Sequence, residues 1–430
     1  MPTSKNKHPF LSLAIWKTHV VFWIGAIVVG LATVSLTIGS EHASQLFKLL
    51  LQEYPLYSFI LTPILLTFLA WLTLSFFKGS EKSGVPQVKA ALQLGNTNNT
   101  EHLLSIRIIV GKLLLSMGGI LSGASVGLGG PSIHIGASLM AFFGRFAKFP
   151  PHYLERGLIL AGSSAGFAAI FSAPLAGIVF AIEEMGRSLE EKTSGLILTA
   201  VIFAGATALI ILGQYVFFAD RLMKLPWGKA WFIIPICGVF TGAIGGLTSF
   251  ILLKGSQFLA NQPFLSPLKI AFLCGIIIAV LNFLSDGSTA GTGYQETKDY
   301  LLHPEIMSGT YPFMRILATI ATFFIGIPAG VFVPSLSIGA GLGADLAAWV
   351  PLAPVSIVIL LGMTGYFAGM FQLPLTSFVI IMEMTNTHQL LLPMMATAFI
   401  ANGTAKLICS QPLYSGLTHR YLKPNTHVQK

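Results

Sequence analysis

The sequence predicts an all-α polytopic membrane protein made of two inverted repeats of broken, tilted helices. The first observation is composition: of 430 residues, 54% are hydrophobic and only 10% are charged, which is too little polar surface for a soluble protein of this length. The second is the recurrence of long apolar runs, and the third is a duplication at a spacing of about 200 residues.

Four apolar stretches are long enough to cross a bilayer core of about 30 Å. They occupy residues 19–38, 56–77, 231–253 and 268–284. Other apolar runs, such as 108–121 and 316–327, are too short for a straight span. Short hydrophobic segments are typical of helices that are tilted or that break inside the bilayer.

Basic residues at both ends of the chain favour a cytoplasmic location for both termini, and therefore an even number of crossings. They are Lys5, Lys7, Lys17, Arg420, Lys423 and Lys430. We interpret the formal net charge of +9 mainly as this topology signal. The predicted organisation is a cytoplasmic segment at 1–18, membrane repeats at 19–217 and 218–410, and a short cytoplasmic C-terminal helix and tail at 411–430.

The duplication consists of two blocks that occur in the same order in each half. GSSAGFAAIFSAPLAGIVFAIEEM (162–185) matches GMTGYFAGMFQLPLTSFVIIMEMT (362–385), and GLGGPSIHIGA (127–137) matches GVFVPSLSIGA (330–340). Arg187 and Lys192 follow the first long block, whereas 386–393 contains no Lys or Arg. This asymmetry favours opposite orientations for the two halves, that is, an inverted repeat.

Each GxxxP segment has the composition of an anion-binding helix start. Proline suits the first turn of a helix, and the preceding glycines allow close backbone approach. A helix that begins inside the bilayer presents unpaired N–H groups and the positive end of its dipole, which favour an anion. The alternative is that these glycines only let helices pack closely.

A third segment, KSGVPQVKAAL (82–92), has the same character. Ser83 can donate a hydroxyl hydrogen bond to an anion, or it can be an ordinary helix N-cap.

These segments resemble the signature motifs of the CLC family of chloride channels and chloride/proton antiporters. The family motifs GSGIP, GREGP and GIFAP correspond to KSGVP (82–86), GLGGP (127–131) and GVFVP (330–334). The family's APLAG, EEM and PLY stretches correspond to 173–177, 183–185 and 412–414. The resemblance covers nearly the whole chain and implies the CLC fold, chloride as the transported ion, no cofactor or metal, no enzymatic activity, and no nucleic acid as a partner.

Carried over by position, the resemblance implies a central anion site formed by the hydroxyls of Ser83 and Tyr414 and the backbone N–H groups of Val331 and Phe332. Backbone around Gly129, Gly130 and Val333 would line an outer site. A serine at position 83 is the form that the family associates with chloride. Without the resemblance, Tyr414 would be interpreted as an interfacial belt tyrosine.

Lys112 matches a buried lysine of the family. A cation inside a membrane is costly unless it has a partner or a role. Lys112 either extends to the interface or supplies positive charge near the anion pathway.

The sequence departs from the family at the gate. The glutamate of GREGP, which competes with chloride and carries the proton in antiporters, is replaced by Gly129, and the arginine before it by Leu128. Glu184 matches the internal proton-transfer glutamate of antiporters, with Arg187 as a nearby partner. We therefore expect passive, channel-like or uncoupled chloride conduction. The alternative is chloride/proton exchange through Glu184 and a displaced carrier such as His134.

The resemblance also implies a homodimer with one pathway per subunit, in the inner (plasma) membrane of a bacterium, and this chain ends too soon for the CBS domains that many members carry. Two other functions fit parts of the sequence. GSSAG (162–166) satisfies the GxSxG motif of serine hydrolases, which requires a strand–turn–helix context. A sodium-coupled solute transporter also uses inverted repeats, but it needs carboxylates or unwound carbonyls for the cation.

Overall fold

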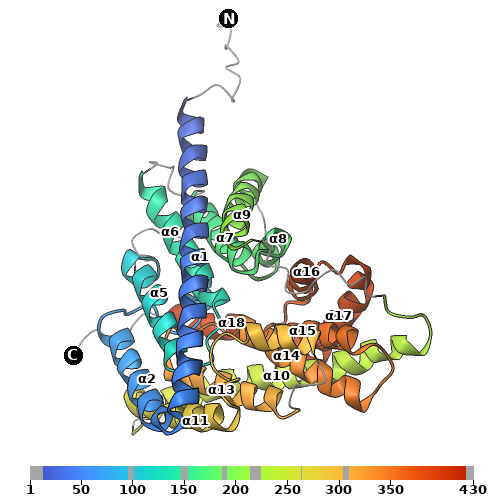
Figure 1. Ribbon diagram of the computed structural model, residues 1–430. Helices are drawn as coiled ribbons and strands as arrows, with labels where there is room; N and C mark the ends of the chain where they lie inside the picture. The colour runs from blue at the N-terminus through green and yellow to red at the C-terminus, as the bar shows by residue number, and fades with distance from the viewer. Residues whose placement is uncertain are drawn as a thin grey trace, which may run out of the picture.

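The protein is all-helical in the part described by the computed structural model, namely residues 13–94, 100, 102–146, 154–185, 191–213, 224–262, 264–303 and 309–422 (Figure 1). Outside the helices, this part contains only two isolated backbone bridges. The predicted fold class is confirmed. The N-terminal residues 1–12, Arg187 and the tail from 423 onward lie outside the described residues.

The first half contains eight α-helices in the described residues. They are α1 (Leu13–Glu53), α2 (Ser58–Ser75), α3 (Val85–Leu94), α5 (Ile106–Leu121), α6 (Gly129–Phe146), α7 (Leu154–Phe171), α8 (Pro174–Phe180) and α9 (Glu191–Leu212). Helix α8 continues into a π-helical turn, Ala181–Met185. Short 3₁₀ turns occur at Pro55–Tyr57, Lys229–Phe232 and His388–Leu390.

The second half repeats this order of helices. Its described members are α10 (Ile233–Ala260), α11 (Pro267–Leu284), α12 (Tyr294–Leu302), α13 (Tyr311–Ile325), α14 (Phe332–Trp349), α15 (Val355–Phe371), α16 (Pro374–Thr385) and α17 (Leu391–Ile408), followed by α18 (Leu413–Leu422). Short helices α3 and α12 occupy equivalent places, as do the 18-residue helices α6 and α14. The repeat boundary predicted at 217 and 218 lies outside the described residues and stays a prediction.

Five helical segments of the described chain are long and apolar enough to cross a membrane: 19–53, 58–75, 229–260, 267–284 and 388–408. The four spans expected from the sequence fall in α1, α2, α10 and α11. Helices α5 and α13 are shorter, with 16 and 15 residues, as the short apolar runs predicted. Large apolar side chains such as Ile60 and Leu273 are exposed on the outer helices, which is the surface that lipid contacts.

The two halves meet through backbone hydrogen bonds between the paired GxxxP segments. The N–H of Gly127 donates to the carbonyl of Gly330, and the N–H of Gly330 donates to that of Gly127, each at 2.8 Å in an antiparallel bridge. A Cβ at Gly127 would lie 2.8 Å from the carbonyl oxygen of Gly330, and one at Gly330 2.6 Å from that of Gly127. Glycine is therefore required at both positions.

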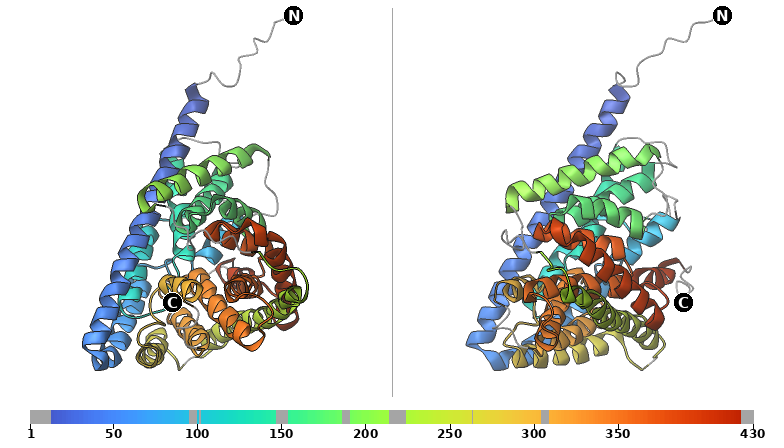
Figure 2. Two further views of the ribbon diagram at one scale, coloured as in Figure 1. Left: turned by 45° about the vertical axis from the view of Figure 1, so that its right-hand side comes forward. Right: turned by 90° about the vertical axis from the view of Figure 1, so that its right-hand side faces the viewer.

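A second reciprocal contact joins the halves through Glu183 and Glu383. The carboxylate of Glu183 accepts the N–H groups of Leu375 and Thr376 at the start of α16, at 2.9 and 2.7 Å. The carboxylate of Glu383 accepts those of Leu175 and Ala176 at the start of α8, at 3.0 and 2.7 Å. Each repeat thus satisfies the unpaired helix-start donors of the other. In Figure 2, the blue-to-green and yellow-to-red helices form neighbouring groups.

Candidate anion pathway

The starts of helices α3, α6, α14 and α18 converge near the centre of the protein. Ser83, which precedes α3, donates to the hydroxyl of Tyr414 in α18 across 3.5 Å. The nearest atom to a Cβ built on Gly130, in the first turn of α6, would be the hydroxyl oxygen of Ser83. Gly330, just before α14, forms backbone hydrogen bonds with Gly127 in the segment that leads into α6. The structure therefore brings together the segments that the sequence singled out separately.

Unusual backbone conformations position the hydroxyl of Ser83. Lys82 has φ +56° and Gly84 has φ +100°, so the chain reverses on both sides of the serine before α3 begins. A Cβ at Gly84 would lie 2.6 Å from the Cβ of His134, which excludes other residues there. Ser83 is fully buried, and its hydroxyl bonds to Tyr414 rather than acting as an N-cap of α3.

Tyr414 is fully buried and is not a belt tyrosine. Its side chain is 0% exposed, and its ring stacks on Phe371 with 5.4 Å between centroids and 11° between planes. Phe332 packs on it at the same centroid distance. The interpretation as an interfacial tyrosine, which the sequence favoured without the resemblance, is therefore wrong.

The backbone donors predicted for the anion lie at two helix starts. Val331 precedes α14, and Phe332 and Val333 form its first turn; Gly129 and Gly130 form the first turn of α6. Amide groups in a first helical turn have no acceptor within their own helix. Both helices carry proline as their third residue, Pro131 and Pro334, and this removes one donor that would otherwise need a partner.

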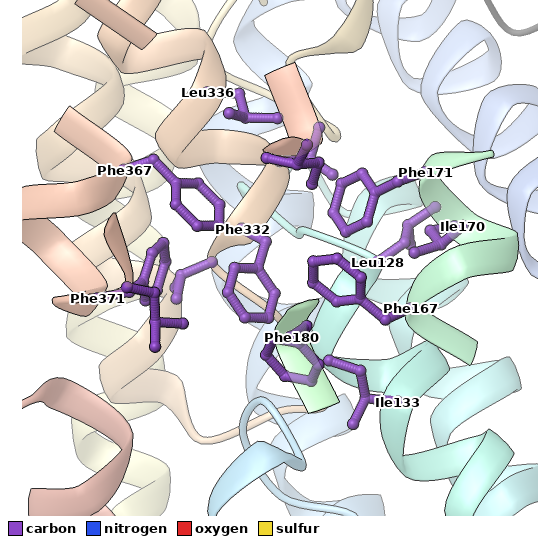
Figure 3. Packing of buried hydrophobic residues seen from close by; sticks show 14 of the residues in the cluster. Leu128, Ile133, Phe167, Ile170, Phe171, Phe180, Phe332, Leu336, Phe367 and Phe371 are labelled. Atoms are coloured by element: carbon purple, nitrogen blue, oxygen red, sulfur yellow. The ribbon is translucent and has the colours of Figure 1, made fainter. Parts of the chain in front are cut away.

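Aromatic rings fill the space beside Gly129. A Cβ at this position would lie 2.8 Å from Cδ2 of Phe332 and 3.1 Å from Cζ of Phe171. Figure 3 shows Phe332 at the centre of a cluster of rings from both halves of the chain. We define the phenylalanine cluster as Phe167, Phe171, Phe180, Phe332, Phe367 and Phe371. The place of the missing carboxylate is therefore apolar and narrow.

The sequence contained the signal for this cluster. Phe167 and Phe171 are spaced by one helical turn in α7, and the duplication repeats them as Phe367 and Phe371 in α15. In the sequence, the repeated pair indicates only the duplication. The four rings contact one another at Phe332 because α7, α14 and α15 pack together, and the sequence pattern does not specify this packing.

The amino group of Lys112 is buried behind Ser83. Its side chain is 0% exposed, and its ammonium group donates to the carbonyl of Lys82 at 2.6 Å. Extension to the membrane interface, one of the two interpretations of Lys112, is therefore wrong. The ammonium instead holds the residue directly before Ser83.

Glu184 is buried and paired with a cation that the sequence analysis missed. The ammonium of Lys89, in α3, lies 2.6 Å from the carboxylate of Glu184 and donates to the hydroxyl of Ser415 at 2.9 Å. Arg187, the partner expected from the sequence, is outside the described residues. Lys89 lies in α3, 95 positions before Glu184 in the sequence, and no spacing signal in the sequence indicates their contact.

His134, the displaced proton carrier considered from the sequence, is buried beside Gly84. Its Nε2 lies 2.7 Å from the carbonyl of Leu103. Because a carbonyl only accepts, Nε2 carries a proton. The other nitrogen, Nδ1, is buried without a hydrogen-bond partner in the described structure.

A cavity of about 420 Å³, which we call the outer cavity, borders this region. Its wall includes Leu128, Phe171 and Val333, together with a salt bridge of 2.7 Å between Lys48 of α1 and Glu296 of α12. The buried guanidinium of Arg315 lies behind it and donates to the carbonyls of Ala290 and Gly291 at 2.9 and 2.8 Å.

The GxSxG motif does not form a nucleophile elbow. Ser164 lies inside α7, and its hydroxyl donates to the carbonyl of Leu160 at 2.7 Å. A serine nucleophile needs a sharp strand-to-helix turn that exposes its oxygen, whereas Ser164 is fully buried in a continuous helix.

Known proteins resemble this chain in both sequence and fold. The H⁺/Cl⁻ exchange transporter ClcA of Klebsiella pneumoniae (strain 342) is 28% identical over 392 residues, which cover 85% of this chain and 79% of that protein. ClcA of Yersinia pestis bv. Antiqua (strain Angola) is 25% identical, with coverage of 94% and 89%.

Two solved structures share the fold. A slow cyanobacterial Cl⁻/H⁺ antiporter superposes with a TM-score of 0.84 at 23% identity, covering 96% of this chain and 99% of that one. A eukaryotic CLC transporter gives 0.76 at 18%, covering 95% and 75%.

The family description "Voltage gated chloride channel" matches residues 65–406, most of the chain. This range includes the starts of α3, α6 and α14, where the signature segments meet. The chain therefore belongs to the voltage-gated chloride channel (CLC) family of integral membrane proteins that transport anions.

Proposed function

We propose that this protein conducts chloride passively, or transports it without coupling to protons. The observation that carries the proposal is Gly129, which faces the rings of Phe332 and Phe171 where the family motif has a carboxylate. A glycine can neither carry a proton nor compete with chloride. The rings present an apolar constriction, and a hydrophobic constriction controls passage through water exclusion rather than through titration.

The pairing of Glu184 supports the same proposal. A glutamate that relays protons must change partners during transport, whereas the carboxylate of Glu184 is held in a salt bridge of 2.6 Å to the ammonium of Lys89. Glu183 has a structural role in this proposal, because both of its oxygens accept hydrogen bonds from the start of α16.

In the proposed pathway, chloride binds between the hydroxyls of Ser83 and Tyr414 and the N–H groups of Val331 and Phe332. A hydroxyl hydrogen can rotate, so the hydrogen that Ser83 gives to Tyr414 can turn to an arriving anion. Gly129, Gly130 and Val333 line the outer step, and Lys112 contributes positive potential from behind Ser83. These groups all come from one chain, which supports one pathway per subunit in a homodimer.

Chloride/proton exchange is the second candidate. The ClcA relatives are H⁺/Cl⁻ exchange transporters, and His134 has a buried Nδ1 without a partner in the described structure. In this version, Glu184 and His134 carry the proton.

We place the protein in a bacterial inner membrane with both termini in the cytoplasm. The repeats at 19–217 and 218–410 would then cross it in opposite orientations.

Chloride efflux from proteoliposomes, recorded together with the external pH, tests the proposed function. The uncoupled mechanism predicts chloride efflux without stoichiometric proton movement. Proton uptake against its own gradient, driven by chloride, would overturn it and favour exchange. His134→Gln then separates the candidates further: it leaves uncoupled flux unchanged but abolishes exchange that depends on His134. A requirement for sodium would revive the cation-coupled alternative.

A further inference from the structure

A large cavity opens beside the loop that leads to Ser83, outside the pathway described above. Its volume is about 1320 Å³, which is far more than a chloride ion occupies and exceeds the roughly 300–1,000 Å³ of pockets that hold whole organic ligands. Segments from five places in the chain form its wall: residues 78–82 before α3, the end of α3, the start of α5, one face of α6 and the end of α18.

Positive charge dominates the wall of this cavity. The cationic residues on it are Lys78, Lys82, Arg107, Arg145 and Arg420. Glu81 is the one acidic residue among the described lining residues, and its carboxylate accepts the N–H of Gly79 at 3.0 Å. Such clustering of cations marks the cytoplasmic side of a membrane protein.

Two of these cations are available to a ligand. Arg107 and Arg420 are exposed at the ends of α5 and α18, and neither forms a salt bridge within the described residues, where the only two pairs are Lys48–Glu296 and Lys89–Glu184. The ammonium of Lys82 is engaged elsewhere, over the ring of Phe323 at 4.8 Å. Lys82 therefore lines the cavity, but its ammonium is directed to Phe323.

A buried hydroxyl on the cavity wall points to a polar ligand. Ser138, on α6, is 1% exposed, and its oxygen has no hydrogen-bond partner in the described structure. A buried polar group without a partner is costly, and the Ser138 hydroxyl can donate to an acceptor placed in the cavity. Arginine guanidinium groups bind phosphate oxygens through paired hydrogen bonds.

We propose that this cavity binds the phosphate group of a larger anion and that occupancy slows chloride transport. A phosphate group can accept hydrogen bonds from the arginine guanidinium groups and from the unpartnered hydroxyl of Ser138, and its negative charge balances part of the excess positive charge. The group can come from a soluble phosphate compound such as a nucleotide or from the headgroup of an anionic lipid. Because Lys82 lies on the wall and directly precedes Ser83, bound negative charge near this loop opposes entry of chloride.

The binding part of the proposal is independent of the transport mechanism, whereas the effect on flux rests on the proposed chloride transport. Binding is therefore measured first, on the purified full chain in neutral detergent and a low-chloride buffer. ATP and pyrophosphate are titrated calorimetrically without divalent metal. In parallel, the chain is placed in phosphatidylcholine vesicles with and without phosphatidylglycerol, and its thermal unfolding is recorded.

Arg107→Gln and Arg420→Gln are the test variants, since both side chains are exposed and their loss leaves the packed interior unchanged. Each is expected to weaken binding about fivefold, the effect of about 1 kcal/mol per cation near a phosphate. Arg107→Lys keeps the positive charge but loses the paired N–H donors of the guanidinium, so it is expected to weaken binding less than Arg107→Gln. Lys406→Gln, an exposed cation at the end of α17 that does not line the cavity, is the matched control.

Saturable binding of ATP or pyrophosphate that both test variants weaken supports a soluble ligand. Stabilisation by phosphatidylglycerol alone, lost in the Arg107→Gln/Arg420→Gln double variant, supports a lipid headgroup. Absence of both responses, or equal weakening by Lys406→Gln, overturns the site. If binding is found, chloride efflux is compared with and without the ligand; unchanged efflux overturns the regulatory part, and absence of any efflux from the unliganded protein counts against the proposed function instead.

Discussion

At the residue scale, the replacement of a gate carboxylate by Gly129 has a packing consequence as well as a chemical one. The space that a side chain would occupy is taken by Phe332 and Phe171. A new side chain at 129 must displace these rings, and overpacking of this kind typically costs about 1–3 kcal/mol. Phe332 lies at the centre of the phenylalanine cluster, whereas the ring of Phe171 also borders the outer cavity.

We predict that Gly129→Glu creates a block of chloride efflux that acid relieves. The ionised carboxylate competes with chloride in the outer site, whereas the protonated form does not, so efflux rises as the pH falls. Gly129→Gln has the same size and stays uncharged like the protonated acid, so its efflux is expected to be independent of pH and close to that of Gly129→Glu at acidic pH. Efflux from proteoliposomes between acidic and neutral pH provides the measurement. Equal pH profiles for the two variants in folded protein would place Gly129 outside the pathway.

The pair formed by Lys89 and Glu184 has an energetic consequence of its own. Both side chains are largely buried, with exposed fractions of 11% and 4%. Removing one member of a buried ion pair leaves an uncompensated charge and typically costs about 3–5 kcal/mol, whereas replacing both with apolar residues of similar volume is often neutral.

We predict that Lys89→Met and Glu184→Leu are each strongly destabilising and that the double variant is close to the parent protein. Thermal unfolding in detergent, analysed as a double-mutant cycle, is the measurement. If the two single effects simply add in the double variant, then the 2.6 Å contact contributes little. If Lys89→Met lowers stability only slightly but introduces chloride-driven proton movement, Glu184 regains the relay role.

At the scale of helices, the reciprocal capping by Glu183 and Glu383 explains why a carboxylate recurs 200 positions apart. Helices α8 and α16 both begin with proline, and their next two N–H groups point to the opposite repeat. A side-chain cap contributes about 0.5–2 kcal/mol. The duplication had indicated that these positions are equivalent, but only the contact between α8 and α16 showed what the carboxylates do.

We predict that Glu183→Ala and Glu383→Ala both lower the unfolding temperature, and that Glu183→Ala does so more. Glu183 also accepts the hydroxyl of Thr376 at 2.7 Å, so its loss removes an additional hydrogen bond. Glu53→Ala, at the exposed end of α1, is the control and is expected to stay within about 0.5 kcal/mol of the parent. A larger effect from Glu383→Ala would argue that the cap on α8 is the dominant one.

At the scale of the whole molecule, the outer cavity carries a charged pair beside the proposed pathway. The salt bridge of Lys48 and Glu296 joins α1 to α12 across this cavity. While the pair is intact, its charges nearly cancel. Removal of Lys48 therefore leaves a negative local potential for an anion, and removal of Glu296 leaves a positive one.

We predict opposite effects on chloride efflux for Lys48→Gln and Glu296→Gln. The first leaves a carboxylate at the mouth and slows efflux, the second leaves an ammonium and accelerates it, and the double variant lies near the parent. Both changes in efflux become smaller as an inert salt is added, because the Debye length falls to about 3 Å at 1 M ionic strength. Efflux rates measured at two ionic strengths test this; changes of equal sign in the two single variants would exclude an electrostatic origin.

How far the sequence predicts the whole molecule depends on the range of each interaction. The fold class and the spans in α1, α2, α10 and α11 follow from apolar runs and the duplication. The convergence of Ser83 with Tyr414 follows only from the resemblance to the family. Lys89 beside Glu184 and the phenylalanine cluster around Gly129 could not be predicted in the same way. They join residues that are far apart in sequence, and only the packing of α3, α7, α14 and α15 brings them together.

The double hydrogen bond between Gly127 and Gly330 limits how the protein can move during transport. Inverted-repeat transporters commonly alternate access by rocking one repeat as a rigid body against the other. Here such rocking would break both bonds at once and leave two amides and two carbonyls unpaired at membrane depth, where no water replaces them. We therefore expect the crossing point to remain stationary while ions pass, with rotations of individual side chains providing the motion.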